Sequence, residues 1–230
     1  MTVRSLKWTE SGATTVTPVN AEIPSLVAAL IHSRQTILPK RLLEPGPNAQ
    51  QLAWIFDAAA AAPDHGQILP WRFIHITESA RPLLSEVFAN ALLERDAQAT
   101  SDQVEQAREK AFRAPLLLLA VVDGARGDSN IDLPERIVSA GCAIQNMLLM
   151  ATALGFGSAL TSGKALHSQV LRQLFSLAAS DHALCFVSVG TAAKRKQEAM
   201  RPVASDYITQ LSATGISCLS RDTNYRNTTS

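Results

Sequence analysis

The chain has 230 residues, of which 47% are hydrophobic and 18% are charged. This balance is typical of a folded globular protein with one domain, or at most two, and it excludes a largely disordered chain. The formal net charge of +1 provides no overall attraction for nucleic acid or for an anionic membrane surface. We therefore expect neither nucleic acid nor a membrane among its partners.

The cysteines and the beginning of the chain indicate a compartment. The three cysteines are widely spaced, and their odd number fits a reducing environment. The first 20 residues contain no apolar segment of the kind found in secretory signals. We therefore expect a cytoplasmic protein, with residues 1–22 forming an extended or partly disordered arm.

The first third of the chain predicts two helices and a strand. Apolar residues at helical spacing after Pro24 predict a helix that ends near Arg34. Asn48 is a typical N-cap for a second helix, which Pro63 ends. The proline-rich segment between these helices predicts a loop. A polar loop follows Pro63, and WRFIHIT (residues 71–77) alternates like a strand.

The remaining two thirds predict further helices around buried strands. Residues 79–112 have a helical pattern with one polar break, and APLLLLAVVDG (residues 114–124) has the continuous apolar run of a strand buried on both faces. Residues 132–155 predict a long apolar helix. Two more strands are expected at 157–163 and 183–191, with a helix between them.

This mixture of elements predicts an α+β fold, in which helices cover both faces of one sheet. We expect the domain to occupy residues 23–211 and to be followed by a polar tail at residues 212–230. No GxGxxG follows a strand, and GxxxxGK[ST], HExxH and GxSxG are absent. The sequence therefore gives no support for a Rossmann site, a P-loop, a metal site or a serine hydrolase.

Two stretches together resemble the FMN-dependent nitroreductase superfamily: AAAAAPDHGQILPWRFI (residues 58–74) and AGCAIQNMLLMATALGFGSAL (residues 140–160). The similarity is to the branch with Pro-Asp-His before Pro-Trp, and it covers about residues 26–211. It implies a central, mostly antiparallel sheet and an intertwined homodimer with two FMN sites in the dimer interface. Gln145 and Asn146, which look buried, are expected to bond across that interface or to a helix end.

The segment IHSRQTILP is similar to the opening motif of the family, an Arg-x-Ser/Thr triplet that grips the phosphate and the ring edge of FMN. The resemblance implies that Arg34, Gln35 and Thr36 bind FMN. The alternative is that Arg34 is an ordinary cation at the C-terminus of a helix.

One position departs from that motif. Many members carry Lys or Arg two residues after the Ser/Thr, near N1 and O2 of the flavin, where this chain has Leu38. Lys40 and Arg41 are nearby candidates for the replacement, and the sequence does not decide which residue supplies the cation.

In this branch, the loop before Pro-Trp reaches across the dimer interface to the partner's flavin. The resemblance thus implies cofactor contacts for Ala61, Pro63, Asp64, His65 and Gln67. The branch often carries Arg where this chain has Ala61. His65 is the titratable candidate for a catalytic role, with a structural role for His65 and proton supply by solvent as the alternatives.

The resemblance also places the strand after the long helix against the flavin ring. Leu160, Thr161, Ser162 and Gly163 would lie there, because small residues let backbone N–H groups approach the ring. A late Arg or Lys commonly binds the FMN phosphate in the family. Arg201 is the candidate in this chain, and an ordinary surface role is the alternative.

The implied activity is that of an FMN-dependent NAD(P)H oxidoreductase. NAD(P)H would pass a hydride to flavin N5 and leave, and an electron-poor small molecule such as a nitroaromatic or a quinone would take its place, which gives ping-pong kinetics. Two alternatives stay open. One is another flavin reaction on the same fold, such as reductive dehalogenation or enone reduction, and the other is a flavin-binding protein without turnover.

Overall fold

The computed structural model describes residues 22–194, 201–213 and 215–218. Contacts divide the chain into two compact units, with the division after Arg195. Nearly all of the arm expected at residues 1–22 lies outside the described residues. Glu22 already belongs to the first helix, α1 (Glu22–Ser33), which ends one residue before Arg34, as the sequence predicts.

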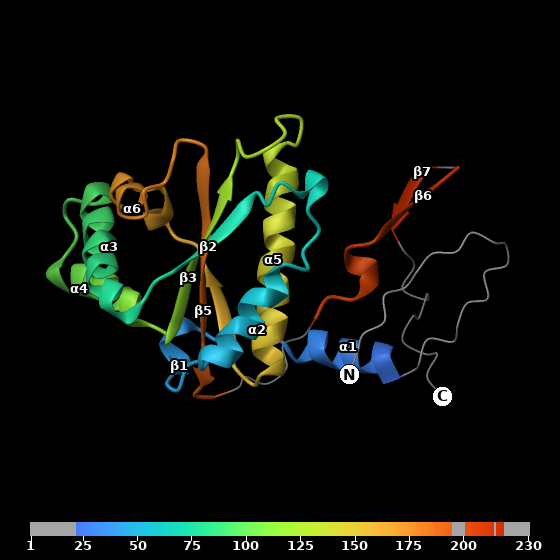
Figure 1. Cartoon of the computed structure of the whole chain (residues 1–230), viewed down its shortest axis with the longest axis horizontal. Coiled ribbons are helices and arrows are strands. Elements are labelled where there is room, and N and C mark those ends of the chain that lie inside the picture. Colours follow the sequence, from blue (N-terminus) through green and yellow to red (C-terminus); the bar gives the residue numbers. More distant parts are fainter. Residues whose placement is uncertain (1–21, 195–200, 214, 219–230) are drawn as a thin grey trace. The chain divides into compact units, whose positions relative to one another are not determined.

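A five-stranded antiparallel sheet forms the centre of the first unit (Figure 1). Four strands follow the order β1-β5-β3-β2, and β4 also pairs with β5. Their bounds are β1 Leu42–Leu43, β2 Trp71–His75, β3 Leu116–Asp123, β4 Gly157–Thr161 and β5 Asp181–Ala192. The strands predicted from the sequence are confirmed. The exception is β1, which lies inside the expected proline-rich loop and buries Leu42 where it pairs with the end of β5.

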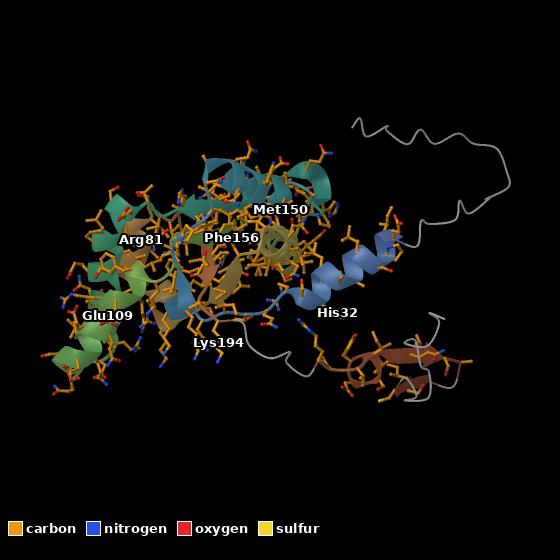
Figure 2. All side chains as sticks on the ribbon, turned by 90° about the horizontal axis from the view of Figure 1, so that it is seen from below. His32, Arg81, Glu109, Met150, Phe156 and Lys194 are labelled. Carbon is orange, nitrogen blue, oxygen red and sulfur yellow. The ribbon has the colours of Figure 1, made fainter. Side chains whose placement is uncertain are left out.

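Helices cover both faces of this sheet. Figure 1 shows α2 (Ala49–Ala59) and α5 (Leu133–Ala153) on one face and α3 (Arg81–Arg95), α4 (Ser101–Glu109) and α6 (Gln169–Leu174) on the other. Figure 2 labels Met150 and Phe156 on the α5 side and Arg81 on the side of α3 and α4. The predicted α+β class, with helices on both faces, is confirmed.

Alternation along β3 explains why its sequence is apolar throughout. Leu116, Leu118 and Ala120 pack in the core below α2 and α5, whereas Leu117, Leu119 and Val121 pack in the core below α3 and α6. Successive side chains of a strand point to opposite faces, so a strand with helices on both sides needs apolar residues at every position.

Local signals in the sequence set the ends of the two helices on the α5 face. Asn48 caps α2 through a capping box: its side chain accepts a hydrogen bond from Gln51 N–H, and the Gln51 side chain accepts one from Asn48 N–H, both at 2.9 Å. α5 ends in a Schellman motif, in which Gly155 has φ of 88° and Phe156 N–H donates to Ala151 C=O at 2.9 Å. Within the described part of the chain, no helix has the length and apolarity to cross a bilayer.

The second unit is a short segment with its own hairpin. β6 (Thr209–Ser212) pairs with β7 (Gly215–Cys218) in an antiparallel register. The expected boundary between residues 211 and 212 therefore falls inside β6, and the expected polar tail contains β7. Its strand residues are indeed exposed. The sequence pattern of residues 212–218 does not signal this pairing.

Asp181 anchors the start of β5. It is 4% exposed and accepts two hydrogen bonds from the Arg72 guanidinium, at 2.9 and 2.7 Å. Ala178 N–H donates a third, at 2.8 Å. The hydrogen bonds from Arg72 hold the pKa of the Asp181 carboxyl below its ordinary value, against the opposing effect of burial.

This pair predicts a pH-dependent contribution to stability. Asp181→Asn should lower the free energy of unfolding by about 1–2 kcal/mol near neutral pH, at the low end for hydrogen bonds to a charge because solvent screens Arg72. The folded-state pKa is depressed, so the contribution is complete above the unfolded pKa of about 4 and is lost as the pH falls through the folded value. Urea denaturation of both proteins at several pH values measures this, and an equal gap in acid and at neutral pH would contradict it.

Candidate functional site

A cleft of about 370 Å³ opens on the α3 and α4 face of the sheet. Its walls come from segments that are far apart in the sequence. Leu117, Phe186 and Ser188 contribute from β3 and β5, and Phe88 and Leu92 contribute from α3. The last residue of β4 and the loop after it, Thr161–Gly163, complete the wall together with Leu38.

The segment that contains the Arg-x-Thr motif reaches this cleft because it runs beside β4. Thr36 forms a parallel bridge with Ser158, and Ile37 N–H donates to Ser158 C=O at 2.9 Å. Gly157 permits the close approach, since a Cβ there would lie 2.9 Å from Leu42 Cδ2 and 3.0 Å from Ile37 Cγ1. The structure thus brings two of the predicted regions together.

The individual residues of these two regions are placed as follows. Arg34 and Gln35 are half-buried and Thr36 is exposed, next to β4, and none of the three lines the cleft itself. Thr161, Ser162 and Gly163 line the cleft, whereas Leu160 is exposed and does not. Arg201 belongs to the second compact unit.

The structure adds four cations that the sequence analysis did not identify. Arg95, Lys110, Arg113 and Lys164 are the charged residues lining the cleft, and their side chains make no hydrogen bond or ion pair with any other residue that the structure describes. Lys110 and Arg113 lie just before β3, in a segment whose sequence pattern indicates only the end of a helix. Neither Lys40 nor Arg41 lines the cleft, so the cations that share it with Leu38 are these four, Lys110 and Arg113 among them.

A buried arginine fixes the segment that carries Lys110 and Arg113. Arg81 donates from Nη1 to Ala111 C=O at 2.7 Å and from Nη2 to Pro115 C=O at 3.0 Å. Burial lowers the pKa of the Arg81 guanidinium, although nearby Glu78 opposes the shift. These bonds cross the residues between α4 and β3 and hold them in one conformation.

Three buried oxygens have no hydrogen-bond partner among the described residues: Gln35 Oε1, Asp64 Oδ1 and Ser158 Oγ. None of them belongs to the wall of this cleft except through neighbours in the chain, and Ser158 is paired with Val189, which packs in the core below α2 and α5, so its hydroxyl faces away from the cleft. The groups that do line the cleft are the backbone and hydroxyls at Thr161–Gly163 and the cations, and they fit a flat polar ring with an anionic tail, as in FMN.

The Pro-Asp-His loop lies on the opposite face of the sheet. Asp64 lines a second hollow of about 420 Å³, with Trp71 and Phe73 of β2 and with Leu118, which faces α2 and α5. Ala61, Pro63, His65 and Gln67 line neither hollow. One chain therefore does not bring this loop to the cleft beside β4.

Hydrogen bonds to α5 and within the loop hold it rigidly. Ser139 Oγ donates to Pro63 C=O at 2.6 Å and accepts from Trp71 Nε1 at 2.9 Å. Asp64 Oδ2 accepts from Leu69 N–H at 2.8 Å. At the tip, His65 Nδ1 lies 2.6 Å from Glu135 Oε1 in the first turn of α5.

The amide pair of α5 is less buried than its sequence predicts. Gln145 is exposed and Asn146 is half-buried, because both lie toward the side of α5 that faces away from the sheet. Val138, 65% exposed, and the exposed Gly141 precede them on that side. The prediction of burial was wrong for the single chain, since an apolar helix sequence does not show which of its stripes the same chain covers.

Comparison with known proteins identifies the class. Residues 31–191 match the Nitroreductase family, so the chain belongs to that family. A Haemophilus influenzae protein named "Putative NAD(P)H nitroreductase" is 32% identical over 173 residues, which are 75% of this chain and 93% of the relative.

Two solved structures share the fold. A nitroreductase from Bacteroides fragilis with bound FMN has a TM-score of 0.62 at 20% identity and covers 81% of this chain and 98% of its own. The FMN-dependent nitroreductase NfnB from Mycobacterium smegmatis, in complex with NADPH, has a TM-score of 0.59 at 16% identity and covers 74% of this chain and 89% of its own.

Proposed function

We propose that the protein is an FMN-dependent oxidoreductase that takes hydride from NAD(P)H and passes it to an electron-poor small molecule, such as a quinone or a nitroaromatic. The observation that carries this proposal is the cleft that joins Leu38, Thr161–Gly163 and Lys110 on one face of the sheet. Its residues supply backbone donors, hydroxyls and positive charge, while the redox chemistry itself comes from FMN when it is bound.

Residues in the cleft wall and in the neighbouring Arg-x-Thr segment have roles in this proposal. Arg34 and Thr36 bind the phosphate end of FMN, and Gln35 offers its unpartnered oxygen to a donor on the cofactor. Thr161, Ser162 and Gly163 support the flat ring. A role for Arg201 as a second phosphate ligand is proposed on the resemblance alone.

In this proposal, Lys110 supplies the positive charge that many family members place at the position of Leu38. Negative charge that develops at the pyrimidine end of a reduced ring is stabilised by a fixed cation inside a partly closed cleft. Lys110→Met should slow flavin reduction by NADPH about 10-fold to 100-fold, as removal of one charge-stabilising group typically does. Stopped-flow absorbance measures the rate.

Lys40→Met is the matched control, since this exposed lysine does not line the cleft. It should reduce at the rate of the unmodified protein. Equal rates for the Lys110 and Lys40 variants would contradict the assignment.

A homodimer with shared sites reconciles the cleft with the loop on the other face. In one chain the Pro-Asp-His loop is remote from the cleft, so we propose that the loop of a second copy approaches it. The uncovered side of α5, with Val138 and Gly141, supports a helix-to-helix contact between copies. Ala61, Pro63, Asp64, His65 and Gln67 would then border the partner's cofactor.

His65 is the proposed proton donor to the acceptor. It is 68% exposed in the single chain and projects from a rigid loop, so its ring can face a ligand held by the partner. Both substrates would occupy the same face of the ring in turn, which requires ping-pong kinetics. The odd number of cysteines supports a reducing compartment, and we propose the cytoplasm.

Three measurements on the purified protein test the proposal. The expected results are a flavin absorption spectrum, release of FMN identified by mass, and rapid anaerobic bleaching by NADPH or NADH. A yellow protein that neither nucleotide bleaches would indicate a flavin-binding protein without turnover. A colourless protein that FMN cannot reconstitute would overturn the proposal.

A further inference from the structure

We infer that Glu135 positions His65 for proton transfer. The inference rests on the proposed function, because it assigns a residue to the second half of that reaction. Glu135 was not among the residues suggested by the sequence, and it stands 70 positions from His65 in the chain. The contact between them joins the Pro-Asp-His loop to the first turn of α5.

The contact joins two rigid segments. The loop is held by Ser139 at Pro63, and its Gly66 has φ of 69°, with the Ile131 side chain 3.2 Å from where a Cβ would be. Glu135 lies in the first turn of α5, next to the buried Arg136. The backbones of His65 and Glu135 are therefore held at a fixed separation by these anchors.

Arg136 holds the segment before α5 as Arg81 holds the segment before β3. Its guanidinium donates to Ile131 C=O at 2.8 Å, Asp123 C=O at 3.3 Å and Asp128 C=O at 2.6 Å. Four peptide oxygens, including that of Arg126, thereby surround one buried side chain. The first turn of α5 and the loop that precedes it are fixed together, and Glu135 with them.

The chemistry of the two groups sets the tautomer. An ionised carboxylate only accepts hydrogen bonds, so Nδ1 of His65 must carry the proton between them at 2.6 Å. This leaves Nε2, on the far side of the ring, as the atom that takes a proton from solvent and gives it up. Carboxylate orientation of an imidazole in this way is an established device for proton transfer.

The second half-reaction needs a proton that Nε2 of His65 can supply. Reduction of a quinone to a hydroquinone needs two electrons and two protons. The hydride brings two electrons and one proton, and the second proton passes from Nε2 of His65 to a quinone oxygen. Water then returns a proton to Nε2. In the first half-reaction hydride leaves NAD(P)H, and this step needs no proton from His65.

The exposure of the His65 and Glu135 side chains distinguishes a role in proton transfer from a role in stability. His65 is 68% exposed and Glu135 is 49% exposed, and an ion pair this accessible contributes little to stability. Removing Glu135 should therefore leave the melting temperature and the FMN content unchanged, and any loss should be confined to the second half-reaction.

A double-mutant cycle tests the inference on the FMN-loaded enzyme. The proteins are the unmodified enzyme, His65→Ala, Glu135→Ala and the double variant, each reduced with dithionite and mixed with 1,4-benzoquinone under anaerobic conditions. The return of flavin absorbance gives the rate. We expect His65→Ala to slow it about 100-fold, at the low end of the range for general acid catalysis. Glu135→Ala should slow it less, by about 10-fold, because the imidazole itself remains. The double variant should be no slower than His65→Ala alone, because Glu135 acts through His65.

Two further variants sharpen the result. Glu135→Gln keeps an oxygen that accepts from Nδ1–H, so it should recover part of the rate lost in Glu135→Ala. Glu105→Gln removes another exposed, paired helical carboxylate on the other face of the sheet, and it should react at the rate of the unmodified enzyme. In the Glu135 and Glu105 variants, reduction by NADPH should stay within about 2-fold, since this step makes no use of the pair.

Specific outcomes would overturn the inference. They are an unchanged rate in Glu135→Ala or in His65→Ala, a double variant slowed by the product of the two single effects, and equal slowing of both half-reactions. Failure of the proposed function looks different, because the unmodified protein would then hold no FMN or would not be reoxidised by the quinone.

Discussion

Replacing Gly141 by leucine should convert the protein to monomers and release its flavin, while each chain keeps its fold. Gly141 lies on the uncovered side of α5, and a Cβ built there meets no atom within 4 Å. The single chain therefore has room for a larger side chain. Removing a mid-helix glycine also raises the intrinsic stability of α5, by up to about 1 kcal/mol.

For the proposed dimer, we expect Gly141→Leu to be disruptive. In a twofold contact between two copies of α5, a small residue lets the backbones approach, and each substitution is present twice. A leucine at this position separates the helices, and the Pro-Asp-His loop of each copy is withdrawn from the partner's cofactor. We expect a shift from dimer to monomer in sedimentation velocity, with FMN lost in parallel.

Asn90→Leu provides the matched control, because Asn90 is an exposed residue in the middle of α3, on the other face of the sheet. It adds a similar apolar side chain and should leave both assembly and FMN content unchanged. A monomeric Gly141→Leu protein that retains FMN would show that one chain is sufficient to hold the cofactor, and the shared site would then be wrong.

Arg34→Ala should weaken FMN binding about 100-fold to 1000-fold, the cost of removing a guanidinium from a phosphate contact worth roughly 3–4 kcal/mol. Arg34 is half-buried beside Thr36, which β4 holds in place through Ser158. Quenching of FMN fluorescence on titration into the apoprotein gives the dissociation constant.

Arg41→Ala is the comparison variant for Arg34. Arg41 is an exposed cation seven positions later that does not line the cleft, and its loss should change the dissociation constant less than 3-fold. The melting temperature of the apoprotein should be the same for both variants. Full FMN retention by Arg34→Ala would leave Arg34 as an ordinary helix-end cation.

Most of the fold could be predicted from the sequence because its signals are local. The capping box at Asn48, the Schellman glycine at Gly155 and the uniform apolar run of β3 each act within a few residues. β1 and β7 could not be predicted in this way. β1 is two residues long in a proline-rich segment and exists only because β5 pairs with it, and β7 depends on a polar hairpin.

The candidate site was predictable only where a contiguous motif carries it. The Arg-x-Thr segment and Thr161–Gly163 can be found by similarity, and the structure places both beside β4. Lys110 and Glu135 are isolated charged residues at helix ends, and a residue of this kind carries no specific functional signal in the sequence. Their relation to Leu38 and His65 arises from how α4 and α5 pack, which no local pattern encodes.

The opposite placement of the cleft and the Pro-Asp-His loop has a consequence for how defects combine. In the proposed homodimer, the groups that bind the phosphate and the acid that donates the proton to one cofactor come from different subunits. Each proposed catalytic centre is therefore a composite of two complementary halves. When one subunit lacks the arginine and its companion lacks the histidine, both faults fall in the same centre, and the other centre keeps a full complement of parts.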